Sequence, residues 1–109
     1  MATDAASSTS LLRPLAEDLA ARREQIKLGG GPEKVAAQHA AEKLTARERL
    51  ALLIDDGTWV ELGIQAQPHF SQTAMAGREA PADGVVTGYG RSDGRLVAVV
   101  AYDFTVMAG

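Results

Sequence analysis

The stretch KLTARERLALLIDDGTWVELG, residues 43–63, holds the clearest run of structural signals in the chain. Thr45, with Glu48 three residues later, forms a capping box, in which each side chain accepts a hydrogen bond from the other's backbone amide, so a helix is predicted to begin here. The apolar face of this helix consists of Leu50, Leu53 and Ile54. Asp55-Asp56-Gly57 ends the helix, and TWVELG predicts a short strand directly after it.

Two further helices are predicted before this stretch. Apolar residues recur at helical intervals over residues 11–28, and Gly29-Gly30-Gly31 ends that helix because glycine propagates a helix poorly and readily adopts a left-handed C-cap. A proline suits the first turn of the next helix, which is rich in alanine and covers residues 32–42. Residues 1–10 are predicted to form a disordered tail. Residues 11–56 thus form a helical arm of three helices.

The last third of the chain is predicted to be β. Residues 63–83 are polar and irregular and indicate a long connection. The segments DGVVTGYG and RLVAVVAYDF then flank RSDG, in which Asp93-Gly94 supplies the positive φ angles of a two-residue hairpin turn, and we assign all the glycines of GYGRSDG to this hairpin. Residues 96–101 are six consecutive apolar residues, which predicts a strand buried on both faces. Residues 57–109 therefore comprise a strand, a long loop and a hairpin, and the fold class is α/β, with an α+β arrangement within this chain.

Composition narrows the class of protein. Hydrophobic residues make up 46% of the 109 residues but aromatic residues only 5%, so the core is expected to be thin. The formal net charge of -3, with both signs interspersed, argues against a nucleic-acid surface. The chain has no cysteine, no signal-peptide pattern at its start and no apolar run as long as a membrane span. We expect a cytoplasmic protein that binds neither nucleic acid nor membranes.

Three segments together resemble a known family. GGGPEKVAAQHAAEKLTARER, KLTARERLALLIDDGTWVELG and ADGVVTGYGRSDGRLVAVVAYDFTVMAG are similar to the N-terminal part of the carboxyltransferase β subunit of biotin-dependent acyl-CoA carboxylases, of the propionyl-CoA and acetyl-CoA type. The resemblance covers residues 15–109 and implies the first strands of a crotonase-like spiral of β-β-α units, incomplete in this chain. The family usually has Gly where this chain has Glu42, Ala82 and Ala108. We expect the first two in surface loops, whereas Ala108 would restrict the backbone near the coenzyme-A site.

The resemblance also implies an activity. Members of the family transfer a carboxyl group from carboxybiotin, carried on a partner protein or domain, to the α-carbon of an acyl-CoA, with backbone amides stabilising the enolate and the ureido oxygen of biotin. In the family those amides lie beyond the segment matched here, so no catalytic residue is expected in this chain. The implied partners are the remainder of the carboxyltransferase, a biotin carboxylase or biotin carrier subunit, and further copies in a homo-oligomer, commonly a hexamer. Two alternatives stay open: a non-catalytic assembly module that docks on a carboxylase partner, and a free-standing small CoA-binding protein.

The candidate site residues fall into two groups. The resemblance places the end of the last strand beside the acyl-CoA groove, which makes Phe104, Met107, Ala108 and Gly109 candidates, although Phe104 and Val106 also suit core packing. Arg47 and Arg49 could contact a CoA phosphate, or form surface ion pairs with the neighbouring Glu48.

No metal site is expected. His39 and His69 are the only histidines, they lie far apart in sequence, and neither has a neighbouring cysteine or a regular carboxylate spacing. For His39 we expect a structural role in helix packing.

Overall fold

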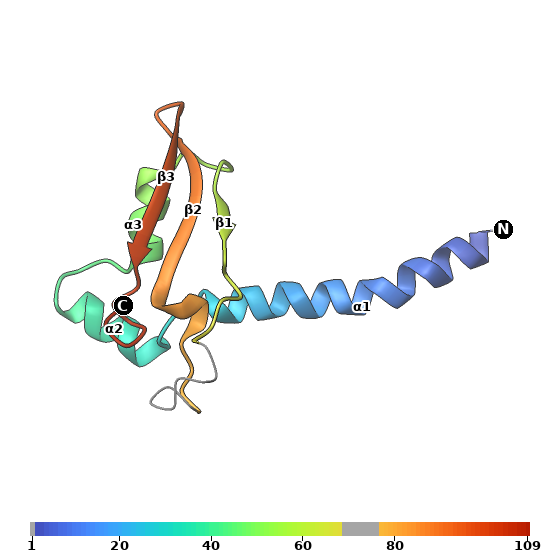
Figure 1. Cartoon of the computed structure of the whole chain (residues 1–109), viewed down its shortest axis with the longest axis horizontal. Coiled ribbons are helices and arrows are strands. Elements are labelled where there is room, and N and C mark those ends of the chain that lie inside the picture. Colours follow the sequence, from blue (N-terminus) through green and yellow to red (C-terminus); the bar gives the residue numbers. More distant parts are fainter. Residues whose placement is uncertain (1, 69–76) are drawn as a thin grey trace.

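The computed structural model describes residues 2–68 and 77–109 and combines helices with an antiparallel sheet. The elements, in chain order, are α1 (Ala2–Ile26), α2 (Pro32–Ala40), α3 (Ala46–Leu53), β1 (Val60–Leu62), the 3-10 helix η2 (Pro81–Gly84), β2 (Val85–Ser92) and β3 (Arg95–Tyr102). The predicted α+β arrangement is therefore present, with the helices first and the strands after them (Figure 1).

The sheet has the order β1-β2-β3, and each strand pairs antiparallel with the next. Asp93 and Gly94 connect β2 to β3 with φ angles of 50° and 79°, which is the left-handed pair that the sequence predicts for this turn. Asp55 fixes the turn from outside, because its carboxylate accepts hydrogen bonds from the amides of Asp93 (3.1 Å) and Gly94 (2.9 Å). A residue just beyond the C-cap of α3 thus also holds the tip of the hairpin.

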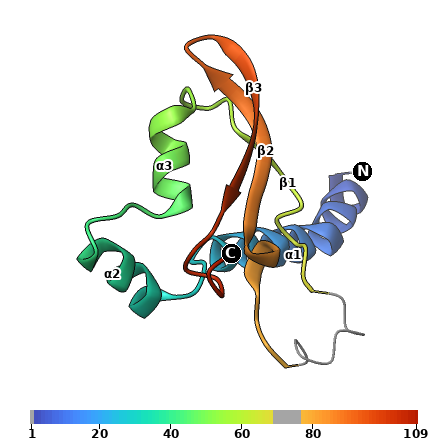
Figure 2. The ribbon, with the colours of Figure 1, turned by 60° about the vertical axis from the view of Figure 1, so that its left-hand side comes forward.

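The core lies between α3 and one face of the sheet (Figure 2). Leu50 and Ile54 from the α3 region pack on Val86 of β2, which is only 1% exposed. The partly buried side chains around them are Trp59, Val97, Val99 and Ala101. Thr45 and Glu48 form the predicted capping box, which fixes the start of α3 and so the position of its apolar face. The core is thin, as the composition predicts.

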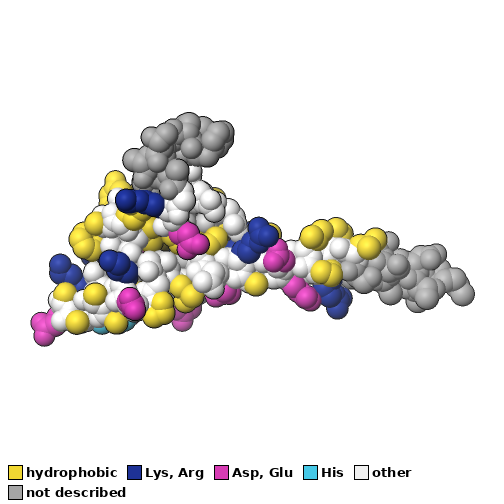
Figure 3. Space-filling model, turned by 90° about the horizontal axis from the view of Figure 1, so that it is seen from below, with side chains coloured by type: hydrophobic (Ala, Val, Ile, Leu, Met, Phe, Trp, Pro, Cys, Tyr) yellow, Lys and Arg dark blue, Asp and Glu magenta, His cyan; other side chains and the backbone are white. Residues whose placement is uncertain are grey.

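Helix α1 extends away from this core (Figure 1). It begins at Ala2, whereas the sequence predicts a tail over residues 1–10; residues 2–10 contain neither glycine nor proline, so they can continue the helical backbone. The Cα radius of gyration is 17.3 Å, against about 13 Å for a compact domain of this length. Hydrophobic side chains lie at the surface along α1, including Leu11, Leu12 and Leu15 (Figure 3). No helix in residues 2–68 and 77–109 is long and apolar enough to cross a membrane.

The outer face of the sheet, which points away from α3, is apolar and uncovered. Its strongly exposed side chains are Leu62, Leu96, Val100 and Tyr102, with Val60 and Tyr89 beside them. The prediction that β3 is buried on both faces is therefore wrong for this chain, in which alternate residues of β3 are exposed. The reason is that the helices cover one face only, and the described residues supply no second layer.

Glycine is required in β2 for a different reason from the one predicted. Gly94 belongs to the hairpin turn, but Gly88 and Gly90 lie inside β2 on its buried face. A Cβ atom at Gly88 would come within 2.2 Å of the Val60 carbonyl oxygen and 2.8 Å of the Trp59 ring, and one at Gly90 within 2.8 Å of Ile54. Close approach of neighbouring groups, and not the turn, therefore requires these two glycines.

Candidate functional site

The segment after β3 is fastened to the turn between α1 and α2. Asp103 is 7% exposed, and its carboxylate accepts hydrogen bonds from both the amide and the hydroxyl group of Thr105. The Thr105 hydroxyl oxygen in turn accepts a hydrogen bond of 3.1 Å from the amide of Gly30. A short polar chain thus joins residues 103–105 to a turn that lies far away in sequence.

Gly29 and Gly30 allow this junction because the backbones approach too closely for a side chain. A Cβ atom at Gly30 would lie 1.8 Å from the carbonyl oxygen of Thr105, and one at Gly29 would lie 2.6 Å from its hydroxyl oxygen. The sequence interpretation of the three glycines as a helix stop captures only part of their role. The one signal for more was the number of glycines, since a C-cap needs a single one.

Two left-handed turns meet at the base of the sheet. Residues 82–84 have φ angles of 52°, 54° and 71°, and residues 107–109 have φ angles of 51°, 60° and 90°. Gly84 lies against the second turn, where an added Cβ atom would be 3.3 Å from the Val106 oxygen. Left-handed backbone is costly for non-glycine residues, so surrounding packing must hold both turns.

The three positions at which the family usually has Gly all have positive φ angles. Glu42 (φ 60°) is exposed, as expected, and Ala108 (φ 60°) lies in the second left-handed turn. Ala82 (φ 52°) is 5% exposed, so the expectation that it lies in a surface loop is wrong. Ala82 belongs to η2, which leads directly into β2 and in which Gly84 is buried as well.

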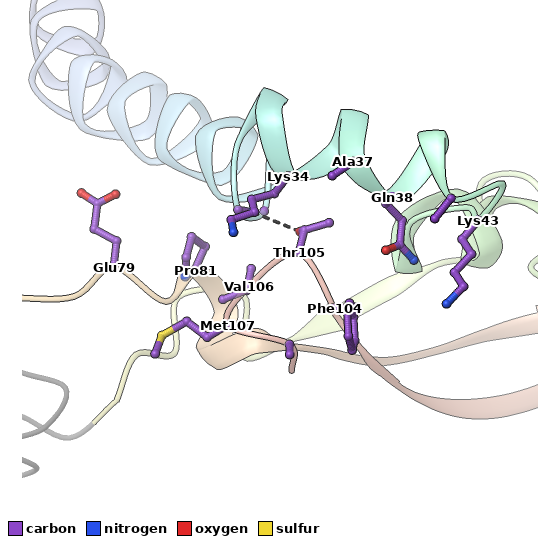
Figure 4. A pocket seen from close by; sticks show the side chains of 14 residues that line it. Lys34, Ala37, Gln38, Lys43, Glu79, Pro81, Phe104, Thr105, Val106 and Met107 are labelled. Atoms are coloured by element: carbon purple, nitrogen blue, oxygen red, sulfur yellow. Dashed lines mark hydrogen bonds between the residues drawn. The ribbon is translucent and has the colours of Figure 1, made fainter.

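A pocket of about 720 Å³ lies between α2 and the segment after β3 (Figure 4). Phe104, Met107 and Ala108, three of the residues suggested by the resemblance, line it together with Lys34 and Lys43. Phe104 is 64% exposed, so it does not serve as a core residue in this chain, whereas the neighbouring Val106 is 3% exposed and does. Gly109 does not line this pocket but lies beside Tyr102.

The two candidate arginines lie in different surroundings. Arg47 forms a bidentate ion pair with Glu61, at 2.8 and 3.0 Å, and its Nε atom is buried without a partner among the described residues. Arg49 is exposed and lines a second pocket, of about 470 Å³, beside Phe104. Neither arginine pairs with Glu48 in the part of the chain that the structure describes, so that expected surface ion pair is absent there.

Glu48 pairs instead with His39, whose Nε2 atom lies 2.6 Å from a Glu48 carboxylate oxygen. This hydrogen bond, followed by those from Thr45, lowers the pKa of Glu48 from 4.5 to about 2. The contact joins α2 to α3, which agrees with the structural role expected for His39. His69 lies outside the described residues. Residues 2–68 and 77–109 bring no three potential metal ligands together, and the absence of a metal site stays a prediction.

The sequence model of the carboxyl transferase domain matches residues 37–109, which include α3, the sheet and the segment after β3. The chain belongs to the carboxyl transferase domain family. The chain is 46% identical over 93 residues to the methylmalonyl-CoA decarboxylase subunit alpha of Propionigenium modestum, covering 85% of the chain and 18% of that protein. It is 46% identical over 90 residues to the mitochondrial propionyl-CoA carboxylase beta chain of Homo sapiens, covering 81% of the chain and 17% of that protein.

The fold is likewise shared with a solved carboxyl transferase. The crystal structure of transcarboxylase 12S, a hexamer with methylmalonyl-coenzyme A and methylmalonic acid bound, superposes with a TM-score of 0.84 at 41% identity. The match covers 89% of this chain and 19% of that one. The crotonase-like fold class is therefore confirmed. The chain spans less than a fifth of the length of these relatives.

Proposed function

We propose that this chain is a segment of an acyl-CoA carboxyltransferase, which transfers a carboxyl group from carboxybiotin to the α-carbon of an acyl-CoA. One observation carries the proposal: the family match includes the residues after β3 that line the pocket, and a solved relative holds methylmalonyl-coenzyme A. On this proposal Phe104, Met107 and Ala108 border the acyl-CoA groove, and Gly109 follows them at its edge. The structure leaves Phe104 exposed, as a ligand-binding side chain requires.

The uncovered outer face of the sheet supports the proposal that this chain is a segment of a larger protein and not a free-standing small protein. Leu96, Val100 and Tyr102 are 67%, 66% and 72% exposed on one strand. A contiguous apolar patch of this kind is unusual on a free protein and is typical of an interface. We infer that the remainder of the carboxyltransferase covers this face and supplies the second layer that β3 lacks.

The chemistry is divided between this chain and that remainder. The described pocket offers ammonium groups, an aromatic ring and apolar side chains, which bind and orient a ligand. We place the backbone amides that stabilise the enolate of the thioester in the remainder of the enzyme. The alternative, a non-catalytic assembly module, is less well supported because the match includes the pocket residues as well as the helices.

The partners and location follow from the same proposal. Biotin is carried on a partner protein or domain and supplies the carboxyl group when it is carboxylated. We propose a biotin carboxylase or biotin carrier subunit as that partner and a homo-oligomer as the assembly, since transcarboxylase 12S is a hexamer. The exposed leucines of α1 provide an apolar stripe for such contacts. A cytoplasmic location remains a prediction from the sequence.

Reconstitution tests the proposal. The chain is mixed or co-expressed with the polypeptide that completes the carboxyltransferase, and carboxylation of propionyl-CoA and acetyl-CoA by carboxybiotin is measured. We expect product from the pair and none from either part alone. Product from this chain alone would refute the placement of the catalytic amides outside it. A stable pair without carboxylation of either substrate would favour the assembly module.

A further inference from the structure

Buried and exposed residues are mixed along the segment after β3. Asp103, Thr105 and Val106 are buried, whereas Phe104 and Met107 are 64% and 48% exposed. The two exposed side chains line the large pocket, and the two buried polar side chains form hydrogen bonds within the chain. The contacts that hold the buried residues therefore also decide where the exposed ones point.

The Thr105 hydroxyl group joins this segment to the turn between α1 and α2. It donates its proton to the Asp103 carboxylate. It accepts a hydrogen bond of 3.1 Å from the Gly30 amide, drawn as a dashed line in Figure 4. Because a hydroxyl group has only one proton to donate, the carboxylate fixes its direction and leaves a lone pair for the amide. We call this hydrogen-bonded set of Asp103, Thr105 and Gly30 the Thr105 clasp.

The clasp is the hydrogen-bonded tie nearest to the end of the segment. In the part of the chain that the structure describes, one further hydrogen bond leaves this segment, from the Asp103 amide to the Gly84 oxygen (2.9 Å). That bond holds only the start of the segment. Beyond Thr105 the backbone enters the left-handed turn of residues 107–109, which surrounding contacts must hold. The clasp therefore anchors the part of the segment that leads into this turn.

The clasp also sets the distance between the two walls of the pocket. Gly30 lies two residues before Pro32, where α2 begins, and α2 contributes Lys34 to one wall. Residues 104–108 form the opposite wall. A Cβ atom at Gly30 would lie 1.8 Å from the Thr105 carbonyl oxygen, so the two backbones already touch there. Loss of the clasp would therefore allow the two walls to move apart.

We infer that Asp103 and Thr105 are positioning residues of the proposed carboxyltransferase: Thr105 holds the two pocket walls together through Gly30, and Asp103 orients the Thr105 hydroxyl group for that bond. Both side chains are buried and act through the groups that they hold in place. This inference rests on the proposed function and deepens it, because it names the residues that shape the site. The expected consequence of losing the clasp is weaker binding of acyl-CoA and not slower chemistry, since the proposed catalytic amides lie in the remainder of the enzyme.

Kinetics of the reconstituted enzyme test the inference. Thr105→Val replaces the hydroxyl group with a methyl group and should raise the KM for propionyl-CoA roughly tenfold, as expected for the loss of one hydrogen bond, with kcat changed by less than about twofold. The KM for carboxybiotin should stay unchanged. Thr105→Ser keeps the hydroxyl group and should restore the parent KM. Asp103→Asn should raise the KM for propionyl-CoA only about threefold, because its amide oxygen still accepts the hydrogen bonds but carries no charge.

Thr58→Val is the matched control. The Thr58 hydroxyl group likewise donates one hydrogen bond, to the Asp55 oxygen, and accepts one from the distant Arg91 amide, but it lies at the hairpin end of the sheet. Its loss should leave the KM for propionyl-CoA unchanged. A lower kcat with unchanged KM in both valine variants would overturn the inference, because a smaller amount of folded enzyme lowers only the apparent kcat. A failure of Thr105→Ser to restore the KM would overturn it as well.

Hydrogen exchange of the Gly30 amide separates this outcome from that of the proposed function. In the full chain, followed by NMR, this amide should exchange roughly tenfold faster in Thr105→Val than in the parent or in Thr58→Val, because it loses its acceptor. Unchanged exchange would overturn the inference. Carboxylation with an unchanged KM for propionyl-CoA in Thr105→Val would also overturn it and leave the proposed function intact. Faster exchange in Thr105→Val, without carboxylation by the parent pair, would refute the proposed function while supporting the clasp as the tie between the two walls.

Discussion

Replacing Gly88 with alanine tests how the sheet is held to its core. The added Cβ atom would lie 2.2 Å from the Val60 carbonyl oxygen and 2.8 Å from two atoms of the Trp59 ring. Ordinary contacts of a carbon atom are longer than 3 Å, so β1 and the indole must both retreat by about 1 Å. Overpacking of this kind typically costs about 1–3 kcal/mol. Because β1 has only three residues, its pairing to β2 is the contact expected to yield.

The assay uses the tryptophan that the substitution displaces. Urea unfolding followed by Trp59 fluorescence should give a midpoint lower by about 1 M in Gly88→Ala, using the usual urea dependence for a small domain. The emission maximum of the folded variant should also move to longer wavelength, because the ring is pushed toward water. Ala98→Val is the control, since it adds side-chain bulk at an exposed position on the other face of the sheet and should change the free energy of unfolding by less than about 0.5 kcal/mol.

The reasoning fails if Gly88→Ala unfolds at the same urea concentration as the parent chain with an unchanged emission maximum. It also fails if the control loses as much stability as Gly88→Ala. In either case the close approach of Trp59 to β2 would not be a property of the folded chain. A loss of stability without a spectral shift would mean that β1 alone retreats.

Three further predictions use the same unfolding measurement. Asp55→Ala removes the carboxylate that holds the two amides of the β2-β3 turn and should cost about 1–2 kcal/mol, whereas Asp56→Ala, at an exposed neighbour, should cost less than about 0.5 kcal/mol. The pKa of Glu48 lies below its usual 4.5, at about 2, so the hydrogen bonds to its carboxylate stabilise the fold above pH 4.5 and lose this effect as the pH falls toward 2. The difference in unfolding free energy between the parent chain and Glu48→Gln should therefore shrink as the pH is lowered over that range. A difference that stays constant would contradict the assignment. Ala108→Gly should raise stability by about 0.5–1 kcal/mol, because Ala108 is exposed at a φ of 60° and glycine adopts this angle without strain; a loss of stability would mean that its methyl group contributes packing.

The candidate site was predictable only in part. The resemblance pointed to Phe104, Met107 and Ala108, and the structure places all three at one pocket. The resemblance did not point to Lys34 or Lys43, which line the same pocket from the other side. Nothing in the spacing of these lysines distinguishes them from the other exposed cations of the helical arm. Their convergence on Phe104 arises because the glycine turn packs against the strand end, which is a contact between distant parts of the chain.

The features that the sequence determined by itself are those that depend on local interactions. The capping box at Thr45 and Glu48 and the Asp93-Gly94 turn each depend on atoms only a few residues apart, and both occur in the structure as predicted. The family assignment rested on the same kind of information, a succession of short motifs in a fixed order. Such features can be predicted from the sequence because the interacting groups lie close together along the chain.

Only the tertiary structure decided which residues face which neighbours. It turned Glu61 inward to Arg47 while leaving the apolar residues on either side of it exposed, and it gave Gly30 and Gly88 their roles through backbone and ring atoms distant in sequence. It also showed that β3 is covered on one face only. The burial of a strand depends on the layers that pack against it. A run of hydrophobic residues indicates that a covering layer is needed, but it does not show which part of the protein supplies that layer.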